Sequence, residues 1–286
     1  MWRLIGFVTF ATFLVLFSSF LQSCSNEKKK AVETTTDKLS GKLVITGSST
    51  VAPLVAEIGK RFEVFHSDVR IDVQMGGSSR GIADAQQGLA DIGMASRALK
   101  DSEQDLFAFP IALDGICIIV HDSNPVSGLS DAQIVDIYTG QINNWREVGG
   151  KDAPITVVNK AEGRATLELF LEHFKLKNKD IKPDVVIGDN EQGIKTIEGN
   201  PNAIGYVSIG TGEYDATHGE PIKLLPLGGV TASIENLRNG TFPMSRPLNL
   251  VTKTPPDGLA KGFIDFASSE KVQDIIEEQY FVPISK

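Results

Sequence analysis

The chain of 286 residues has few of the side chains that build metal centres and disulfide frameworks. It holds two cysteines and four histidines, and no two histidines show the H-x-x-x-H spacing of a metal-binding helix. Cys117 lies inside an apolar run at 115–120, and Cys24 has a different predicted role, described below. We therefore expect no disulfide, no metal site and no cofactor.

Two further absences narrow the classes of function. No G-x-x-x-x-G-K-[ST] motif is present, which argues against a P-loop ATPase. Acidic residues outnumber basic ones by 36 to 28, the net charge is −8, and no basic stretch follows residue 40. This balance argues against nucleic acid as a partner. It also means that an anion site must depend on short-range donors, because long-range attraction is missing.

The first residues contain the one long hydrophobic run of the sequence. Arg3 precedes apolar residues at 4–17, and small residues lead to LQSC at 21–24. This order predicts a signal peptide at 1–23, although the length is close to the roughly 18 to 20 residues of a membrane-spanning anchor. LQSC resembles a bacterial lipobox, apart from Gln22. We therefore expect lipidation at Cys24, a flexible tether at 24–40, and a location on the periplasmic or cell-surface face of a bacterial membrane.

Three turns rich in glycine and hydroxyl residues follow apolar strand patterns and open helical ones. They are TGSSTV at 46–51, GGSSRG at 76–81 and GRAT at 163–166. A helix start offers unpaired N–H groups and a positive dipole end, which suit an anion. Plain helix capping explains one such turn equally well. Their recurrence favours a single anion site built from several turns.

Apolar periodicity alternates between strand and helix along the chain, which predicts an α/β fold with a mostly parallel sheet. Two α/β units are joined by strands expected at 116–120 and 248–251. We expect these units to form two lobes with a cleft between them, lobe 1 from 41–117 plus 250–286 and lobe 2 from 118–249. Helices are expected at 51–65, 80–89, 130–138, 164–174, 190–198, 257–268 and 270–279.

Five ordered segments carry a resemblance to a known family. They are TGSSTVAP at 46–53, GGSSRG at 76–81, IGMASRAL at 92–99, DIYTG at 136–140 with Trp145, and AIGYV at 203–207. Together they resemble the extracytoplasmic phosphate-binding proteins of ABC-type phosphate importers. The resemblance implies a two-lobed periplasmic-binding-protein fold of type II with two hinge-crossing strands. It also implies a monomer that binds inorganic phosphate in the cleft and delivers it to an ABC permease with its ATPase, without catalysis.

The resemblance also implies the ligands. The expected set comprises Ser49, Thr50, the Val51 amide, Ser78, Ser96, Arg97, Lys160, Gly163, Arg164 and Thr166, with Ser79, Asp114 and Ala165 as weaker candidates. The loop at 160–166 departs from the family, because Lys160 replaces an arginine and Arg164 a serine. Lysine is a point donor whereas arginine is a planar fork. Arg97 in a surface ion pair, and Arg164 turned to solvent, are the alternatives.

The identity of the anion stays open at this stage. Phosphate carries a proton near neutral pH, so a phosphate site needs an acceptor for it, and a carboxylate would repel sulfate. Asp114 and Glu162 are the candidate acceptors. Another tetrahedral oxyanion, such as sulfate or molybdate, is the alternative ligand.

Two other classes of function remain as alternatives. GSSRG at 77–81 fits the G-x-S-x-G elbow of a serine hydrolase, with Ser79 as nucleophile and His121, His173 or His218 as base. A surface protein of the same fold could also serve adhesion or anion scavenging without a permease.

Overall fold

A computed structural model describes residues 38–284. The predictions for the signal peptide, for Cys24 and for most of the tether fall on residues 1–37, outside the described residues. In the described residues no helix has the length and apolar character needed to cross a bilayer.

Strands and helices alternate through most of the chain. The strands are β1 Gly41–Gly47, β2 Val69–Met75, β3 Ile92–Ala95, β4 Phe107–His121, β5 Thr156–Lys160, β6 Val185–Ile187, β7 Ala203–Ser208, β8 Ile222–Leu225, β9 Ser245–Thr252 and β10 Val282–Pro283. The helices are α1 Ala52–Phe65, α2 Ser78–Gln87, α3 Asp131–Tyr138, α4 Ala165–His173, α5 Asn190–Glu198, α6 Ile209–Thr217, α7 Ile234–Arg238, α8 Gly258–Ala267 and α9 Gln273–Glu278.

The strands form one sheet in the order β2-β1-β3-β9-β4-β7-β5-β6, and β8 and β10 each pair with β4. The pairs at both ends are parallel, but β9 and β4 run antiparallel to each other and to β3 and β7 respectively. The expected mostly parallel sheet is therefore corrected to a mixed one. Strands β4 and β9 cross between the two parallel sets of strands in opposite directions. They therefore pair antiparallel with each other and with the strands beside them.

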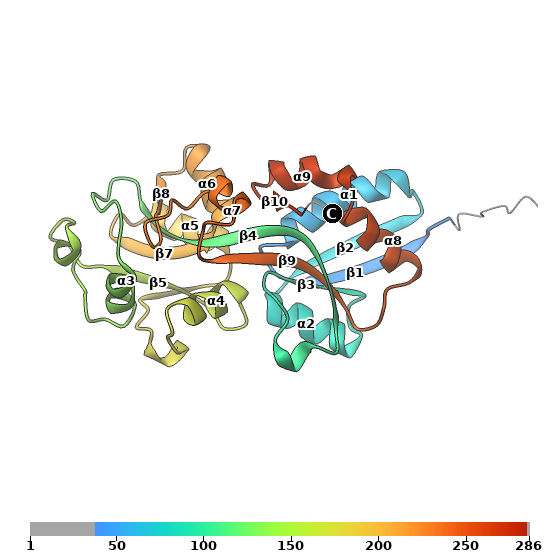
Figure 1. Ribbon diagram of the computed structural model, residues 1–286, viewed down its shortest axis with the longest axis horizontal. Helices are drawn as coiled ribbons and strands as arrows, with labels where there is room; N and C mark the ends of the chain where they lie inside the picture. Colours follow the sequence, from blue (N-terminus) through green and yellow to red (C-terminus); the bar gives the residue numbers. More distant parts are fainter. Residues whose placement is uncertain (1–37, 285–286) are drawn as a thin grey trace, which may run out of the picture. The chain divides into compact units, whose positions relative to one another are not determined.

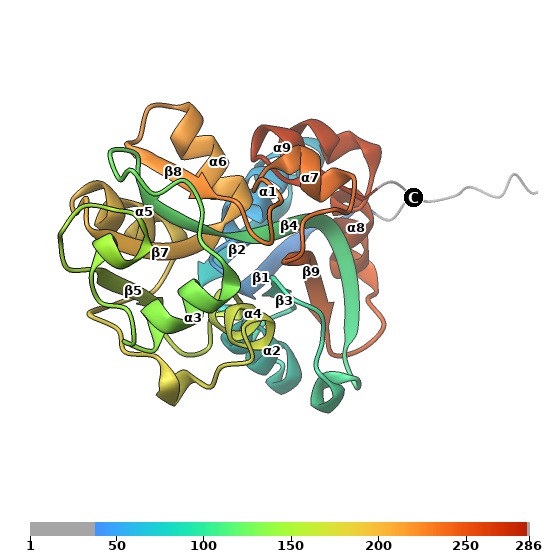
Figure 2. The ribbon, with the colours of Figure 1, turned by 60° about the vertical axis from the view of Figure 1, so that its left-hand side comes forward.

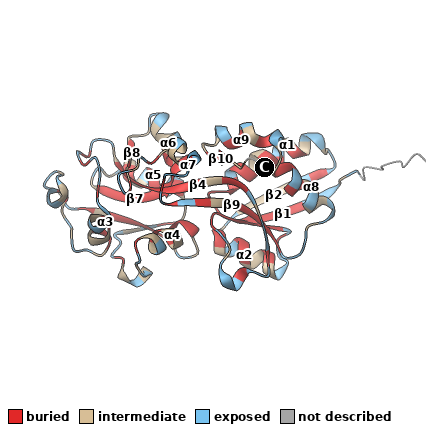
Figure 3. Cartoon of the chain, in the orientation of Figure 1, coloured by how far each residue is buried: buried red, intermediate tan, exposed pale blue. Residues whose placement is uncertain are grey.

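Strands β4 and β9 run between the two halves of the described chain, as Figure 1 shows, and each half has its own hydrophobic core. The first core takes its residues from 43–112 and 248–281, and the second from 116–244 with Val282. In the view of Figure 3 the buried residues gather on the strands and on the inner faces of the helices. The two crossing strands that the sequence predicts are therefore present. Strand β4 begins earlier than expected, at Phe107, and its pairing with β9 is irregular between Pro110 and Ala112.

Local sequence explains most of the elements. Helix α1 buries Leu54, Val55, Ile58 and Phe62 at helical spacing. Ser130 caps α3 and pairs with Gln133 as a capping box. Helices α6 and α7 and strand β8 were not predicted, because α6 contains two glycines and the other two elements are only five and four residues long. Trp145 begins a short 3-10 helix.

Candidate functional site

Four helices begin at one pocket between the two cores. Helices α1 and α2 belong to the first core side, and α4 and α5 pack against strands of the second. The lining residues come from the starts of these helices and from the ends of β3 and β5: Ser48, Ser49, Thr50, Gly77, Ser78, Ser96, Lys160, Arg164, Ala165, Thr166, Gly188, Asp189 and Asn190. The first N–H groups of each helix have no partner inside the helix. The pocket therefore combines four positive dipole ends with a dense set of hydroxyls.

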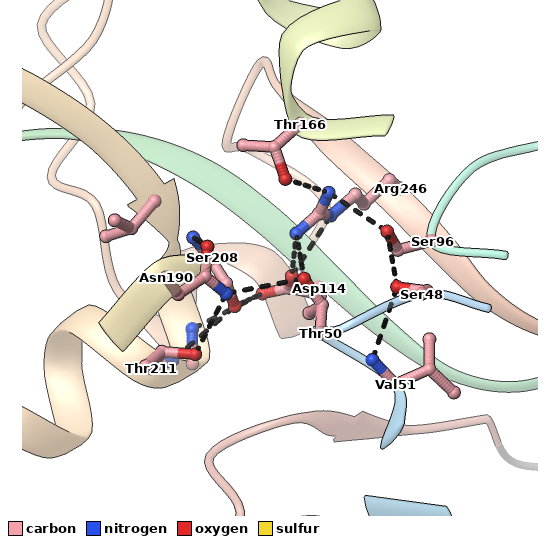
Figure 4. A network of polar contacts seen from close by, with 12 residues as sticks. Ser48, Thr50, Val51, Ser96, Asp114, Thr166, Asn190, Ser208, Thr211 and Arg246 are labelled. Atoms are coloured by element: carbon pink, nitrogen blue, oxygen red, sulfur yellow. Dashed lines mark hydrogen bonds and ion pairs between the residues drawn. The ribbon is translucent and has the colours of Figure 1, made fainter. Parts of the chain in front are cut away.

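Arg246 lies directly behind this pocket, and its side chain is fully buried. It projects from β9, and its guanidinium donates to Thr166 Oγ1 at 3.0 Å, to Ser96 Oγ at 3.3 Å and to Thr50 Oγ1 at 3.4 Å. Figure 4 shows the guanidinium at the centre of these hydroxyls. Because the three hydroxyl oxygens accept from Arg246, their O–H groups remain available to donate toward the pocket. One cation thereby orients hydroxyls from three separate loops.

Asp114 balances the charge of Arg246. Its Oδ2 accepts from Arg246 Nε at 3.0 Å and from a terminal nitrogen of the same side chain at 2.8 Å. Its Oδ1 accepts from the Ser208 hydroxyl at 2.8 Å and from the Gly210 amide at 3.3 Å. Both oxygens of Asp114 are thus already engaged, and the carboxylate does not line the pocket. Asp114 is therefore not placed to accept a proton from an anion in the pocket, and it positions Arg246 instead.

Side chains from the two cores meet across the pocket. A terminal nitrogen of Arg164 donates to Ser49 Oγ at 3.5 Å, and Asn190 Nδ2 donates to Thr50 Oγ1 at 3.3 Å. Asn190 is buried and also accepts from Lys160 Nζ at 3.2 Å. An anion held here would touch both sides of the molecule at once.

Lys160 is a buried cation at the end of β5. Its Nζ donates to the Asp189 carbonyl and to Asn190 Oδ1, so its partners are neutral acceptors. Burial lowers the pKa of Lys160 to about 7; the charges of Arg246 and Arg164 act in the same direction, while Asp189 opposes them. The ammonium therefore lacks a counter-charge in direct contact, and an anion beside it would stabilise its charged form.

Most of the residues expected at the site lie together. Those that line the pocket are Ser49, Thr50, Ser78, Ser96, Lys160, Arg164, Ala165 and Thr166. The Val51 amide donates instead to Ser48 Oγ at 3.3 Å, within its own turn. Gly163 lies beside the pocket, where its carbonyl accepts from the Ser79 amide at 3.2 Å. Arg164 reaches across the pocket rather than pointing to solvent.

Arg97, an expected ligand, lies outside the pocket and is not placed to contact an anion there. Its two terminal nitrogens donate to the two carboxylate oxygens of Glu103 at 2.7 and 2.8 Å, and its Nε forms an ion pair with Glu168 at 2.9 Å. The side chain is only 5% exposed. Its guanidinium is held by Glu103, by the Ala98 carbonyl and by the ion pair with Glu168, and the residue does not line the pocket. Arg246, which was not among the expected ligands, is the arginine that contacts the pocket hydroxyls.

The remaining acidic and nucleophilic candidates also have other partners. Glu162 is exposed and accepts from Asn178 at 2.8 Å. Ser79 Oγ donates to Glu168 at 3.1 Å. The three histidines expected as bases lie elsewhere: His121 contacts Ser123, His173 lies 3.8 Å from Asp131, and His218 contacts the Tyr214 carbonyl. The hydrolase geometry is therefore not assembled around Ser79.

Sequence reasoning missed Arg246, Asn190 and Ser48, although weak signals existed for each. Arg246 and Asp114 are single charges set in apolar strands that were both expected to cross between the lobes. Opposite charges in such strands could have been paired. Asn190 follows Gly188 and the capping residue Asp189 after a strand, which is a fourth copy of the glycine turn before a helix. In residues 38–284 no group of three or more histidine, cysteine, aspartate or glutamate side chains is arranged so that it could hold a metal ion.

Comparison with known proteins places this geometry in a family. The model of the PBP superfamily domain matches residues 32–271. A solved structure of a putative phosphate ABC transporter substrate-binding protein from Clostridium perfringens, with bound phosphate, is 35% identical, has a TM-score of 0.79 and aligns with 86% of this chain and all of that one. The chain belongs to the PBP superfamily, among the substrate-binding proteins of phosphate ABC transporters.

Other relatives span the same length. The phosphate-binding protein PstS of Bacillus subtilis is 29% identical over 285 residues, which cover 95% of this chain and 93% of that protein. An ABC-type phosphate transport receptor from Vibrio cholerae is 30% identical, with a TM-score of 0.69 and coverage of 85% of this chain and all of that one. The two-lobed α/β fold expected from the sequence is confirmed, and the family is one of transport receptors.

Proposed function

We propose that this chain is an extracytoplasmic receptor that binds inorganic phosphate in the pocket between the two cores and delivers it to an ABC permease. The observation that carries the proposal is the convergence of four helix starts and three Arg246-bound hydroxyls on one pocket. The helix starts and the hydroxyls supply donors suited to a multiply charged oxyanion. The bound phosphate in the Clostridium perfringens homologue supports the same ligand.

The donors are sufficient in number and strength. We assign the hydroxyls of Ser49, Thr50, Ser78, Ser96 and Thr166 and the first amides of α4 and α5 to the phosphate oxygens, because early amides of α1 and α2 already donate to Ser48 and Gly163. Arg164 and the buried Lys160 add positive charge beside these donors. Hydrogen bonds to a charged group contribute roughly 1.5 to 3 kcal/mol each, and micromolar binding needs about 8 kcal/mol, so five or six good donors suffice.

The receptor performs no chemistry in this proposal, and its partners are a permease and a separate ATPase. We retain Cys24 as a lipid anchor to the membrane. The lobes are assigned as 41–117 plus 250–286 and 118–249, a division supported by the two separate cores. Closure would follow from the ligand contacting both lobes, because only the closed state gains both sets of hydrogen bonds.

Calorimetric titration of the purified chain with phosphate, sulfate, molybdate and arsenate tests the proposal. We expect saturable binding of phosphate at one site per chain, with micromolar or tighter affinity. If the chain binds none of the four oxyanions, the proposal is refuted. Sulfate binding as tight as that of phosphate would indicate a general oxyanion receptor. Sulfate is a specific competitor to measure, because both oxygens of Asp114 already have partners.

A further inference from the structure

Glu168 joins the two sides of the molecule outside the ligand pocket. Its carboxylate accepts a hydrogen bond from Ser79 Oγ at 3.1 Å and forms ion pairs with Arg97 Nε at 2.9 Å and Lys100 Nζ at 2.8 Å. None of these four residues lines the pocket. Their cluster is therefore separate from the groups assigned to the anion.

The cluster takes its residues from both sides of the molecule. Glu168 belongs to α4, whose residues Leu167 and Phe170 pack in the second core. Ser79 lies in the first turn of α2, and Arg97 and Lys100 follow β3, all on the first core side. Figure 2 shows α4 and α2 next to each other. The Ser79 amide also donates to the Gly163 carbonyl at 3.2 Å. Ser79 therefore contacts the opposite side through both its backbone and its side chain.

We propose that Glu168 is a closure residue: it holds the two lobes together through Ser79, Arg97 and Lys100, and so sets the affinity for the ligand without touching it. The affinity part of this inference rests on the proposed function, whereas the contact between the lobes does not. Glu168 is a positioning residue in this scheme.

The physical reason lies in what opening would separate. Arg97 keeps its fork with Glu103, which is on the same side of the molecule, but Glu168 would lose all three of its partners together. The Arg97 side chain is 5% exposed and that of Glu168 is 23% exposed, so the pair is screened less than a surface pair. These contacts exist only when the lobes meet. They therefore shift the open–closed equilibrium toward the state that binds, which raises the apparent affinity.

Glu168→Gln in the full-length chain is the direct test, because glutamine keeps the size and the acceptor for Ser79 but removes the charge. We expect the dissociation constant for phosphate to rise about tenfold, which corresponds to about 1.4 kcal/mol. The change should appear in the dissociation rate, since the contacts form after the ligand enters. Asp152→Asn is the matched control: it removes the same charge from an exposed pair with Arg146, and it should leave both rates unchanged.

A double-mutant cycle attributes the effect to the contact itself. Lys100→Gln alone should weaken binding by a smaller factor, and adding it to Glu168→Gln should cost less than the two single effects combined. The difference between wild type and Glu168→Gln should also shrink as salt rises, because the pair is partly exposed. Full additivity would remove Lys100 from the scheme.

Hydrogen–deuterium exchange separates this inference from the proposed function. In the ligand-free chain, Glu168→Gln should speed exchange at the Ser79 amide, whose acceptor lies on the opposite side, and leave the amides of α8 unchanged. If wild type binds no phosphate, the proposed function fails while this readout still tests the contact. If wild type binds and Glu168→Gln changes neither the dissociation rate nor this exchange, the inference is overturned.

Discussion

Two buried arginines of this protein have carboxylate partners, yet they lie in opposite situations. Arg97 is enclosed by Glu103 and Glu168, so acidic groups occupy its donors. Arg246 has the single partner Asp114, and its remaining donors reach hydroxyls that line the pocket. The first arrangement binds protein to protein, whereas the second keeps hydroxyls aimed at a ligand. In this protein the carboxylates around each buried arginine separate the two uses.

Removing each arginine in turn should give the largest effects and could break this comparison. We expect Arg246→Met to weaken phosphate binding at least about a thousandfold, because three loops lose the group that orients their hydroxyls. It should also lower the free energy of unfolding by about 3 to 5 kcal/mol, since Asp114 is left buried without its partner. Arg97→Met should weaken binding by about tenfold or less, through the Glu168 contact alone. Calorimetric titration and urea unfolding measure both quantities.

A second substitution separates binding from folding in that experiment. Adding Asp114→Asn to Arg246→Met should recover part of the lost stability, because the buried charge is removed, without restoring affinity. Recovery of affinity would mean that Arg246 contributes only to folding. Equal losses of affinity for Arg97→Met and Arg246→Met would contradict the distinction between the two arginines.

Removal of Arg164, which lines the pocket, should weaken phosphate binding to an intermediate degree. Arg164 reaches Ser49 across the pocket, whereas Arg80 is exposed and pairs with Asp84 on its own helix. We expect Arg164→Ala to weaken phosphate binding about 10- to 50-fold, in line with the loss of one charge-assisted contact, and Arg80→Ala to change it less than about twofold. Titration of both variants under one ionic strength checks this. Equal effects would mean that the loop at 160–166 does not face the ligand.

The pH dependence of binding should be the smallest effect, and it depends on Lys160. Its pKa is lowered to about 7. A bound anion favours the charged ammonium and raises that pKa, so binding takes up protons between the two values. Affinity should therefore fall as the pH rises above about 7. Because phosphate also titrates in this range, the measurement is the ratio of affinities of wild type and Lys160→Met, which should fall about three- to tenfold between pH 7 and 9.

Lys195→Met is the control for the same experiment. Lys195 is exposed and pairs with Glu198 and Glu220 away from the pocket, so its ratio to wild type should stay constant with pH. A ratio for Lys160→Met that does not change with pH would show that Lys160 keeps one protonation state throughout.

Local patterns were enough to predict the elements that shape the pocket. The turn before α1 and the apolar face of that helix were predicted because caps and periodicity are properties of neighbouring residues. The same holds for α5, whose predicted bounds agree with the structure. Short elements with few apolar residues, such as α7 and β8, escaped because their stability comes from packing rather than from their own pattern.

Candidate residues within the glycine turns could be named from the sequence, but their partners could not. Ser96 and Arg97 are adjacent in one segment, yet Ser96 lines the pocket and Arg97 turns away to Glu103. Arg246 and Asp114 are separated by 132 residues and meet because β4 and β9 pair in the register that sets Asp114 opposite Arg246. That register depends on the whole sheet.

The sequence by itself determined the α/β alternation, the two crossing strands and the recurrence of helix starts suited to an anion, because each depends on residues close together in the chain. Only the tertiary structure decided which arginine serves the pocket and that Glu168 connects the two sides. The reason is that the use of a buried charge is set by the groups around it, and those groups arrive from distant segments when the sheet and the helices pack.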